Sequence, residues 1–262
     1  MKILVMVKEV AEVEEDFEIA DNRIDERYLQ YDLNEWDDYA IEEAVQLSES
    51  NEDIEVVTVT IGPERAEETI RMALAKGADR SIRIWDEELN RDLLDIETKT
   101  EIFATVVQQE DPDLILSGVQ ANDDSFGATG VALAKKIDYE WAAVVNGLDA
   151  DFDTGSATVR RELEGGVEEI TEVDLPAVLT IQTGINEPRY ASLRGIRQAQ
   201  EKEIATYDLS DISIEEETIS PKLTLTSLYE PETESDTTYF EGDPEEQASQ
   251  LADLLRERGV TE

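Results

Sequence analysis

The 262-residue sequence predicts an α/β fold: a doubly wound, mainly parallel sheet with an antiparallel meander at its edge and an extended C-terminal arm. Two patterns support this prediction. Short apolar runs alternate with amphipathic helical patterns four times in the first half of the chain, as expected of parallel strands joined by right-handed crossovers. After about residue 142, three strand-like runs are separated by the turn sequences Asp-Thr-Gly and Glu-Gly-Gly, which is typical of antiparallel neighbours.

The first strand is expected at residues 3–7, where an uninterrupted apolar run indicates burial on both faces of the sheet. Residues 9–33 are charged and weakly patterned, so they form either a hairpin or an excursion over the strand ends. Asn34 can cap a helix that has acids in its first turn and apolar residues at helical spacing as far as Leu47.

The second strand is expected at residues 54–61, because this apolar run is closed by Gly62-Pro63. The following helix, residues 64–76, places its apolar residues on one side and stops at Gly77, a favourable C-terminal glycine. The alternation then continues with a strand at residues 81–85, a helix at 92–109 and a strand at 114–116.

The antiparallel strands are expected at residues 142–148, 157–163 and 167–173, and a further buried strand at 176–181. Residues 184–194 form a loop that leads into a helix ending near residue 203. From residue 206 the chain is rich in Ser, Thr, Pro and acids, and a last helix is expected at 244–258.

This pattern divides the chain into an α/β domain, residues 1–205, and a C-terminal arm, residues 206–262. The arm has few apolar anchors with which to build a core of its own. We therefore expect it to pack on a partner chain.

The composition excludes several classes of function. Asp and Glu number 65 against 22 Lys and Arg, a net charge of -43 that is spread along the chain and is typical of a surface adapted to high salt. No basic patch for nucleic-acid phosphates is evident. There is no Cys or His for a disulfide, a thiolate or the usual general base. The sequence shows neither a signal peptide nor a membrane span, so a cytoplasmic protein is expected.

One strand-to-helix connection stands out. The apolar strand at residues 114–116 runs into a polar, glycine-containing stretch that ends at a helix start, Thr129-Gly130. In an open parallel sheet, ligands bind beyond the carboxyl ends of the strands, and the free amides of a helix N-terminus can hold a phosphate without any Lys or Arg. The connection predicts a nucleotide site, although an ordinary polar turn explains its composition equally well.

Three segments, in this order, resemble the β subunits of electron transfer flavoproteins, here of an acidic, haloarchaeal type. They are residues 68–80 (Glu-Thr-Ile-Arg-Met-Ala-Leu-Ala-Lys-Gly-Ala-Asp-Arg), 118–130 (Gly-Val-Gln-Ala-Asn-Asp-Asp-Ser-Phe-Gly-Ala-Thr-Gly) and 186–196 (Asn-Glu-Pro-Arg-Tyr-Ala-Ser-Leu-Arg-Gly-Ile). The resemblance extends over about residues 1–205. The shared order and spacing of the segments make chance a poor explanation.

The resemblance implies a Rossmann-like, adenine-nucleotide-binding subunit of a heterodimer, with AMP in this chain and FAD mainly in the α subunit. Electrons would pass from acyl-CoA-type dehydrogenases to that flavin and on to a membrane quinone oxidoreductase, as in fatty acid oxidation. Such a chain is an electron carrier subunit and not an enzyme. The lack of His, Cys and an acid/base constellation agrees with this role.

The AMP contacts implied by the resemblance fall where the fold places a ligand, at the predicted carboxyl ends of strands. They are Met6, Asn34, Glu35, Trp36, Asp37, Ile61, Gly118, Val119, Gln120, Ala121, Asn122, Asp123, Asp124, Ser125, Phe126, Gly127, Ala128 and Thr129. Met6 and Ile61 would meet the nucleoside, and Thr129 with the amides around it would hold the phosphate. No catalytic or metal-binding residue is expected.

Two positions depart from the family pattern or have two interpretations. Asn34-Glu-Trp-Asp stands where the family often has Asn-Pro-aromatic, so Trp36 is either the aromatic that approaches the flavin ring or a core or interface aromatic. Glu162 matches a position near the subunit interface, or is one solvated acid among many.

The segment around Leu193 corresponds to the family's recognition loop, which docks into the partner dehydrogenase. A protruding leucine among polar residues suits this role, because it buries apolar area in a partner pocket. The docking residues expected from the resemblance are Arg189, Tyr190, Leu193 and Ile196. Alternatively, Leu193 caps the helix below it and Arg189 forms a structural salt bridge.

Two other functions remain open at this stage. Electron-bifurcating and nitrogen-fixation-type members of the same family carry a second FAD in place of AMP, although Phe126 and Thr129-Gly130 favour AMP. A homodimeric nucleotide-binding stress protein of related fold is the alternative from another class. It gives no reason for the 186–196 segment or for the long acidic arm.

Overall fold

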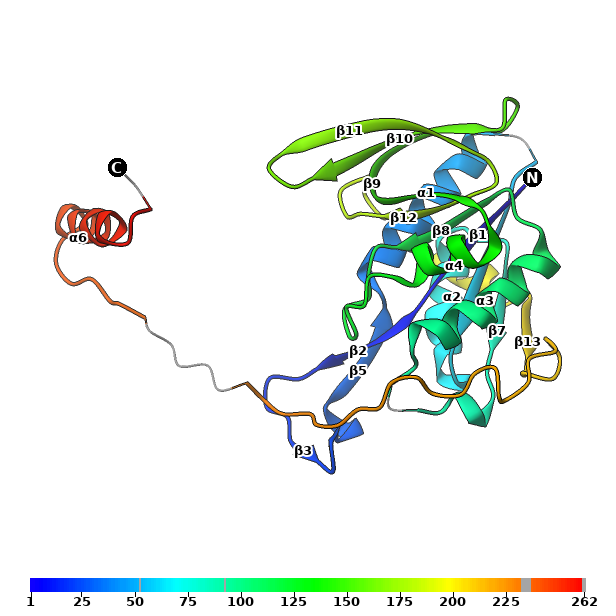
Figure 1. The fold of residues 1–262 in the computed structure, drawn as a ribbon, viewed down its shortest axis with the longest axis horizontal. Helices are drawn as coiled ribbons and strands as arrows, with labels where there is room; N and C mark the ends of the chain where they lie inside the picture. Colours follow the sequence, from blue (N-terminus) through cyan, green and yellow to red (C-terminus); the bar gives the residue numbers. More distant parts are fainter. Residues whose placement is uncertain (52, 92, 232–236, 261–262) are drawn as a thin grey trace. The chain divides into compact units, whose positions relative to one another are not determined.

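The computed structural model describes residues 1–51, 53–91, 93–231 and 237–260 (Figure 1). The chain divides into two compact units, Met1–Leu228 and Tyr229–Glu262. The expected α/β domain, residues 1–205, lies within the first unit, together with the first part of the expected arm.

The first unit is built on a nine-stranded sheet with the order β11-β10-β9-β12-β8-β1-β6-β7-β13. All neighbours from β9 to β13 in this order are parallel, whereas β10 runs antiparallel to both β9 and β11. The strands are β1 (Lys2–Met6), β6 (Glu55–Ile61), β7 (Arg80–Ile84), β8 (Leu114–Gly118), β9 (Glu140–Asp151), β10 (Ser156–Leu163), β11 (Val167–Asp174), β12 (Ala177–Ile181) and β13 (Ile204–Tyr207). The predicted fold class, including the antiparallel edge meander, is confirmed.

The sheet is doubly wound around β1. The chain adds β6 and then β7 on one side of β1, and returns to add β8 and then β12 on the other side. The cores on the two faces contain residues of different helices: α1 (Glu35–Ser50), α2 (Glu67–Lys76) and α5 (Leu193–Ala199) on one face, and α3 (Ile96–Glu110) and α4 (Thr129–Ile137) on the other. The point between β1 and β8, where the winding reverses, is therefore open for a ligand.

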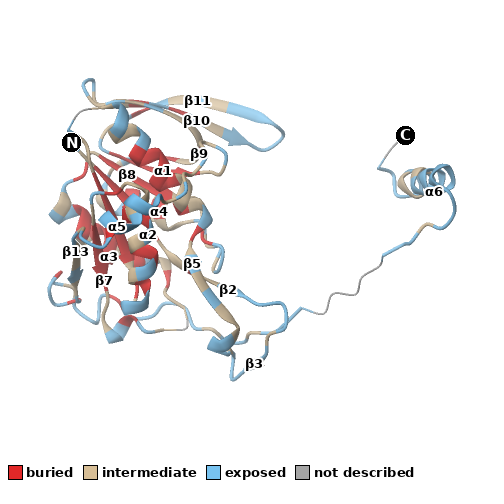
Figure 2. Ribbon diagram, turned by 180° about the vertical axis from the view of Figure 1, so that it is seen from behind, coloured by how far each residue is buried: buried red, intermediate tan, exposed pale blue. Residues whose placement is uncertain are grey.

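The central strands are buried on both faces (Figure 2). Ile3 packs in the core under α1 and α2, while its neighbour Leu4 packs in the core under α3 and α4. Burial of one such side chain stabilises the fold by about 1.5–3 kcal/mol. Burial on both faces explains why these strands appear in the sequence as continuous apolar runs instead of alternating patterns.

Residues 9–33 form the hairpin, the first of the two alternatives. Strand β2 (Glu9–Val13) pairs antiparallel with β5 (Leu29–Leu33). A shorter hairpin of β3 (Ile19–Ala20) and β4 (Arg23–Ile24), followed by the 3₁₀ helix η1 (Glu26–Tyr28), lies between them.

Several helix ends differ from the predicted ones. The turn expected to open α2 is a 3₁₀ helix, η2 (Glu64–Ala66), and α2 ends as predicted at Gly77, which has a φ of 138°. Helix α3 begins at Ile96 because the Asp95 carboxylate accepts a hydrogen bond from Thr98 N at 2.9 Å. The predicted start of that helix, Asp92, lies outside the described residues. Helix α5 ends at Ala199, before the expected residue 203.

Strand β13 crosses the position at which the arm was expected to begin. Its four residues pair in parallel with β7 at the edge of the sheet. Farther along the chain, Leu209, Ile212 and Ile219 are buried in the core on the α3 face. These three buried residues are isolated apolar positions in a polar stretch, so their spacing does not show the period of a helix or of a strand.

The second unit contains α6 (Pro244–Glu257), close to the helix expected at residues 244–258. Asp243 and Glu246 form a capping box, with Pro244 at the first helical position. None of the helix residues is buried. Among the residues described, no helix is both long and apolar enough to cross a membrane.

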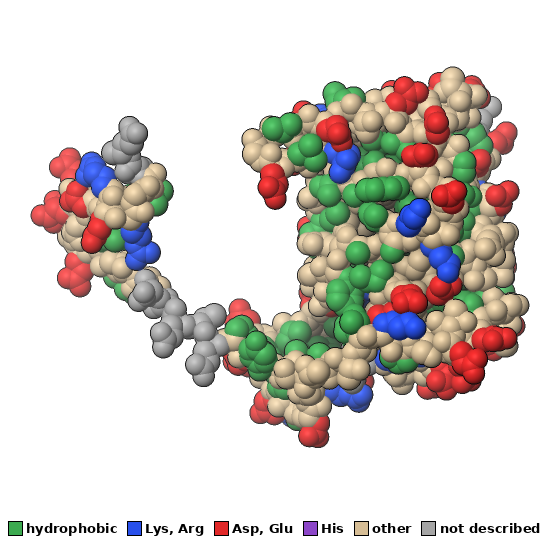
Figure 3. All heavy atoms as spheres, viewed as in Figure 1, with side chains coloured by type: hydrophobic (Ala, Val, Ile, Leu, Met, Phe, Trp, Pro, Cys, Tyr) green, Lys and Arg blue, Asp and Glu red, His purple; other side chains and the backbone are tan. Residues whose placement is uncertain are grey.

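Acidic side chains are distributed over the molecule instead of forming one patch. Figure 3 shows them at the top, the right and the bottom of the drawn face of the first unit and also on α6. This distribution agrees with the spread of acids along the sequence.

Candidate functional site

A cavity of about 610 Å³ lies at the point where the winding of the sheet reverses. Its walls come from the carboxyl ends of β1, β6 and β8, from the start of α1 and from the loop that joins β8 to α4. The residues predicted for nucleotide contact that line it are Met6, Asn34, Asp37, Ile61, Gly118, Val119, Gln120, Ala121, Asp123, Asp124, Gly127, Ala128 and Thr129. The tertiary structure thus brings most of the predicted set into one cavity.

The remaining predicted residues do not line this cavity: Glu35, Trp36, Asn122, Ser125 and Phe126. Trp36 is half-buried and donates a hydrogen bond from Nε1 to Gln182 Oε1 at 3.0 Å, beyond the end of β12. The backbone N–H of Asn122 donates a hydrogen bond to Asn34, and the Phe126 ring contacts the Lys99 ammonium group. Both contacts help to hold the conformation of the loop.

We call the lining residues near β6 and the 3₁₀ helix η3 (Glu87–Leu89) the apolar end of the cavity, and those of the β8–α4 loop its polar end. Met6, Ile61, Leu89, Leu94 and Phe103 supply the apolar side chains, and they belong to β1, β6, η3 and α3 or the segment before it. The polar end is formed by residues 117–130, and the charged residues Arg65, Glu87 and Arg91 also line the cavity. An apolar pocket for a base next to a polar cradle for a phosphate is the arrangement that a nucleotide requires.

The first turn of α1 holds the β8–α4 loop through side chains. Asn34 is the N-cap residue of α1, as predicted, but its side chain makes no cap hydrogen bond. Its Nδ2 donates to Gln120 O at 2.9 Å and its Oδ1 accepts from Asn122 N at 3.1 Å. Long-range backbone groups of the loop therefore compete successfully for a side chain that the local pattern assigned to the helix.

Asp37, one turn later, joins the ends of two strands. Its carboxylate accepts hydrogen bonds from Lys8 N and Gly118 N, both at 2.8 Å. Burial raises the pKa of Asp37 to about 7, although these two amide donors, the side chain of Asn34 and the charge of Lys8 act to lower it. Asp37 therefore positions β1 and β8 relative to each other at the cavity.

The raised pKa of Asp37 predicts a measurable pH dependence of stability. A carboxyl whose pKa is higher in the folded state than its ordinary 3.8 is most stabilising when protonated, and this contribution is lost as the pH rises toward about 7. We expect the free energy of unfolding of the protein, relative to that of Asp37→Asn, to fall by a few kcal/mol between pH 4 and pH 7. Urea titrations of both proteins across this range measure the difference, and a difference that rises with pH contradicts the assignment.

Two glycines allow the loop and its flanking helices to approach closely. A Cβ on Gly118 would lie 2.5 Å from Trp36 Cβ and 2.6 Å from Asp37 Oδ1. A Cβ on Gly130 would lie 2.7 Å from Thr180 Cγ2 and 2.8 Å from Ser117 Oγ. A side chain at Gly118 would push the loop away from α1. A side chain at Gly130 would push α4 away from the sheet.

Ser117 lies at the end of β8, lines the cavity and was not predicted as a site residue. It is 4% exposed, and its Oγ has no hydrogen-bond partner among the described residues. A buried hydroxyl without a partner costs about 1–3 kcal/mol.

Two lysines in the cavity wall were also missed. Lys8 follows β1 and Lys99 lies on α3, and both ammonium groups contact Asp124 Oδ2, at 2.8 Å and 2.9 Å. Lys8 could have been suspected because it comes directly after a strand end. Lys99 gives no such signal, since it lies within an amphipathic helix.

The predicted docking residues lie elsewhere, on the segment before α5. Tyr190 is 97% exposed and Leu193 is 79% exposed, and Ile196 is also exposed. Leu193 is the first residue of α5, which Ser192 caps by accepting a hydrogen bond from Gly195 N. The leucine side chain thus projects from a fixed helix start and does not cover the helix below it.

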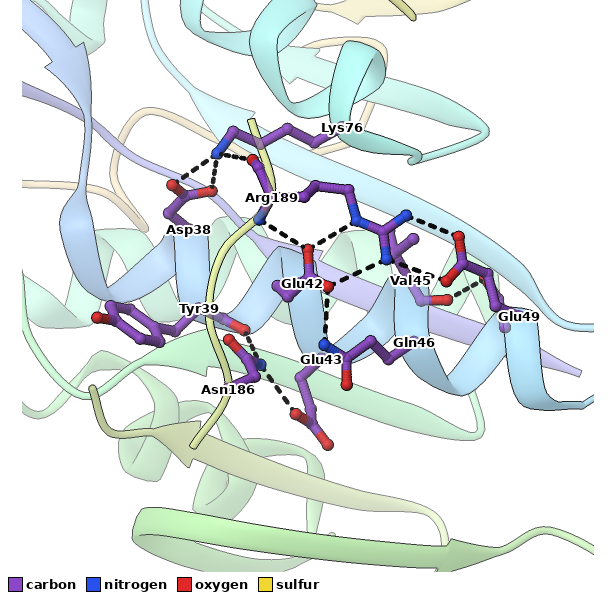
Figure 4. A network of polar contacts seen from close by, with 11 residues as sticks. Asp38, Tyr39, Glu42, Glu43, Val45, Gln46, Glu49, Lys76, Asn186 and Arg189 are labelled. Carbon is purple, nitrogen blue, oxygen red and sulfur yellow. Dashed lines mark hydrogen bonds and ion pairs between the residues drawn. The ribbon is translucent and has the colours of Figure 1, made fainter. Parts of the chain in front are cut away.

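Arg189 is held within the chain (Figure 4). Its guanidinium forms ion pairs with Glu42 and Glu49 of α1 at 2.8 Å and 2.6 Å, and hydrogen bonds and charges from both carboxylates raise its pKa. Lys76 donates to Arg189 O, and Asn186 donates to Tyr39 O. Of the two interpretations of Arg189, the structure contains the salt bridge.

Glu162 lies on β10 and is exposed, as both interpretations of this residue require. Within the described part of the chain, no three acidic side chains are arranged to hold a metal ion.

Comparison with known proteins identifies the family of this fold and cavity. The family profile described as "Electron transfer flavoprotein domain" matches residues 21–212. The chain is 43% identical to the "Electron transfer flavoprotein subunit beta" of Methylophilus methylotrophus, over 98% of each protein. It is 34% identical to that of Bacillus subtilis, over 98% of each, and 34% identical to that of Sus scrofa, over 78% of this chain and 77% of the relative. The chain therefore belongs to the electron transfer flavoprotein family and, within it, groups with the β subunits, which transfer electrons and are not enzymes in their own right.

Proposed function

We propose that the chain binds one AMP in the cavity between β1, β6 and β8. The observation that supports this best is the pairing of an apolar end, around Met6 and Ile61, with a polar end formed by the β8–α4 loop. The base fits the apolar end, where backbone groups at the ends of β1 and β6 can select it. The phosphate fits the polar end, beside the first amides of α4.

In this proposal the AMP has a structural role. Asn34 and Asp37 of α1 hold the backbone of the β8–α4 loop, and a ligand bound to that loop would tie α1, β8 and α4 together. The nucleotide would thus stabilise the folded state at the carboxyl ends of the central strands, where the winding reverses.

The second partner in the proposal is an α subunit that carries FAD. Trp36 and Glu162 are the residues of this chain assigned to the flavin side and to the subunit interface. Leu251 of α6 is exposed, which supports packing of the second unit on that subunit, whereas the arm up to Leu228 belongs to the first unit. FAD would supply the redox chemistry, while this chain helps to enclose it.

The third part of the proposal is docking. Tyr190, Leu193 and Ile196 would enter a pocket of an acyl-CoA-type dehydrogenase, and Arg189, held by Glu42 and Glu49, would keep their backbone in place. Electrons would continue to a membrane quinone oxidoreductase, in the service of fatty acid oxidation in a cytoplasm of high salt.

The main test is the composition of the purified complex. We expect the tagged chain to retain a second, FAD-containing subunit and to release one AMP and one FAD per heterodimer when denatured, measured by chromatography of the extract. Two FAD and no AMP would support the bifurcating type of β subunit. Recovery of a homodimer without flavin would support the stress-protein alternative.

Docking predicts a large effect of Leu193→Ala. The second-order rate of flavin reduction by a medium-chain acyl-CoA dehydrogenase of the same organism should fall at least about tenfold, because a buried anchor leucine is lost. Leu223→Ala is the matched control: Leu223 is also exposed, but it follows Lys222, whose backbone N–H contacts Asp95 at the start of α3. Equal rates for the two variants contradict the docking assignment.

A further inference from the structure

Two lysines that are far apart in the sequence meet at one carboxylate inside the cavity. Lys8 and Lys99 both contact Asp124 Oδ2, and Lys8 also contacts Asp123 Oδ1 at 2.5 Å. Lys99 is almost buried, and its ammonium group lies 5.1 Å from the centre of the Phe126 ring. Phe126, which does not line the cavity, thus covers one side of this ammonium group.

The cluster is unusual for this chain. Only 22 basic residues accompany a net charge of -43, yet two of them are placed beside each other, one of them largely removed from water. Two ammonium groups at this separation repel each other, and burial of either is costly unless an anion compensates. Asp123 and Asp124 supply this compensation with one carboxylate for each ammonium group, so a phosphate would take over contacts that these carboxylates make.

The other donors of the cavity lie on the same loop and its flanking elements. Gly127 to Gly130 line the cavity at the start of α4. The amide groups of this helix start and two ammonium groups are donors that suit a phosphate monoester.

We propose that Lys8 and Lys99 bind the phosphate of the nucleotide and make the cavity select a nucleotide over a nucleoside. The proposal rests on the proposed AMP site and replaces the expectation that backbone amides alone hold the phosphate. Asp123 and Asp124 orient the two lysines and keep their charge compensated when no phosphate is bound. Lys8 and Lys99 are thus specificity-determining residues of the site.

Asp124 is suited to this role because it stays ionised. Burial acts to raise the pKa of Asp124, but hydrogen bonds and charges from Lys8 and Lys99 outweigh it, and the pKa is lowered. Asp124 Oδ1 accepts a hydrogen bond from Phe126 N at 3.2 Å, so the same carboxylate also fixes the turn that carries the aromatic ring.

The test compares AMP with adenosine on the intact heterodimer, stripped of AMP but retaining its FAD, by titration calorimetry. In Lys8→Met and in Lys99→Met, the ratio of AMP affinity to adenosine affinity should fall at least about tenfold, while adenosine affinity stays within about twofold. Lys136→Met is the matched control, because Lys136 is paired with Glu101 and does not line the cavity. Its ratio should equal that of the unchanged protein.

The outcomes separate the two levels of the proposal. If the unchanged protein binds neither AMP nor adenosine, the proposed AMP site itself is wrong. If it binds AMP, and both lysine variants keep the AMP-to-adenosine ratio, the assignment of the lysines is overturned. Lys99→Arg controls for misfolding, and it should restore the preference for AMP. If Lys99→Met binds neither ligand and Lys99→Arg does not restore this preference, the assignment is also overturned.

Discussion

Gly118→Ala should lower the affinity for AMP by about a hundredfold and reduce the free energy of unfolding by about 3 kcal/mol. The added Cβ would lie 2.5 Å from Trp36 Cβ and 2.9 Å from the Trp36 carbonyl carbon, both parts of the rigid first turn of α1. That turn must move away, and the hydrogen bond from Gly118 N to Asp37 Oδ1 is then lost. Calorimetry with AMP and urea unfolding measure the two effects.

Gly147→Ala provides the control for this prediction. Gly147 lies on β9, and a Cβ there would be 3.2 Å from Arg160 Cβ and Nε, a contact that a shift of a few tenths of an ångström relieves. This variant should keep its AMP affinity and lose no more than about 1 kcal/mol of stability. If Gly118→Ala binds AMP as tightly as Gly147→Ala does, then AMP binding does not need the close approach of α1 and the loop.

A rise in KCl from 0.1 M to 2 M should raise the melting temperature by at least about 10 °C. The net charge of -43 is spread over the surface, so the folded state concentrates like charges that the unfolded chain separates. At molar salt the Debye length is only about 3 Å, and this repulsion is screened. For a protein of this size, a gain of about 3–5 kcal/mol corresponds to a shift of this order.

Circular dichroism melts in KCl measure the effect, and KCl is preferable to sulfate because sulfate by itself strengthens apolar burial. The triple change of Glu215, Glu216 and Glu217 to glutamine removes three exposed charges. It should raise the melting temperature at 0.1 M KCl and leave it nearly unchanged at 2 M. A melting temperature independent of KCl would mean that the acidic surface does not limit stability.

The strands and helices of the core could be predicted because their signals are local. The continuous apolar runs of β1 and β12 and the glycine after α2 report on burial and chain reversal within a few residues. The position of the nucleotide loop also followed from chain order, since a strand that ends in a glycine-containing turn before a helix has few alternatives in an open parallel sheet.

The parts that could not be predicted depend on contacts between distant segments. Strand β13 has only four residues, and it forms because β7 offers a free edge 123 residues earlier in the chain. Asn34 has the local signature of a helix cap, but its side chain binds Gln120 O, which no local pattern reveals. The sequence allows Arg189 either to contact a partner protein or to form a structural salt bridge. Only the fold places Glu42 and Glu49 beside it.

The sequence by itself determined the α/β class, the order of the central elements, the strongly acidic character and the membership of the family, because periodicity, charge and motif spacing are properties of neighbouring residues. The tertiary structure decided which side chains share the cavity. Lys8, Lys99 and Asp124 lie on three separate elements and meet only after the sheet has formed. Charge interactions act through space and not along the chain, so the electrostatics of the site could be assigned only in the folded protein.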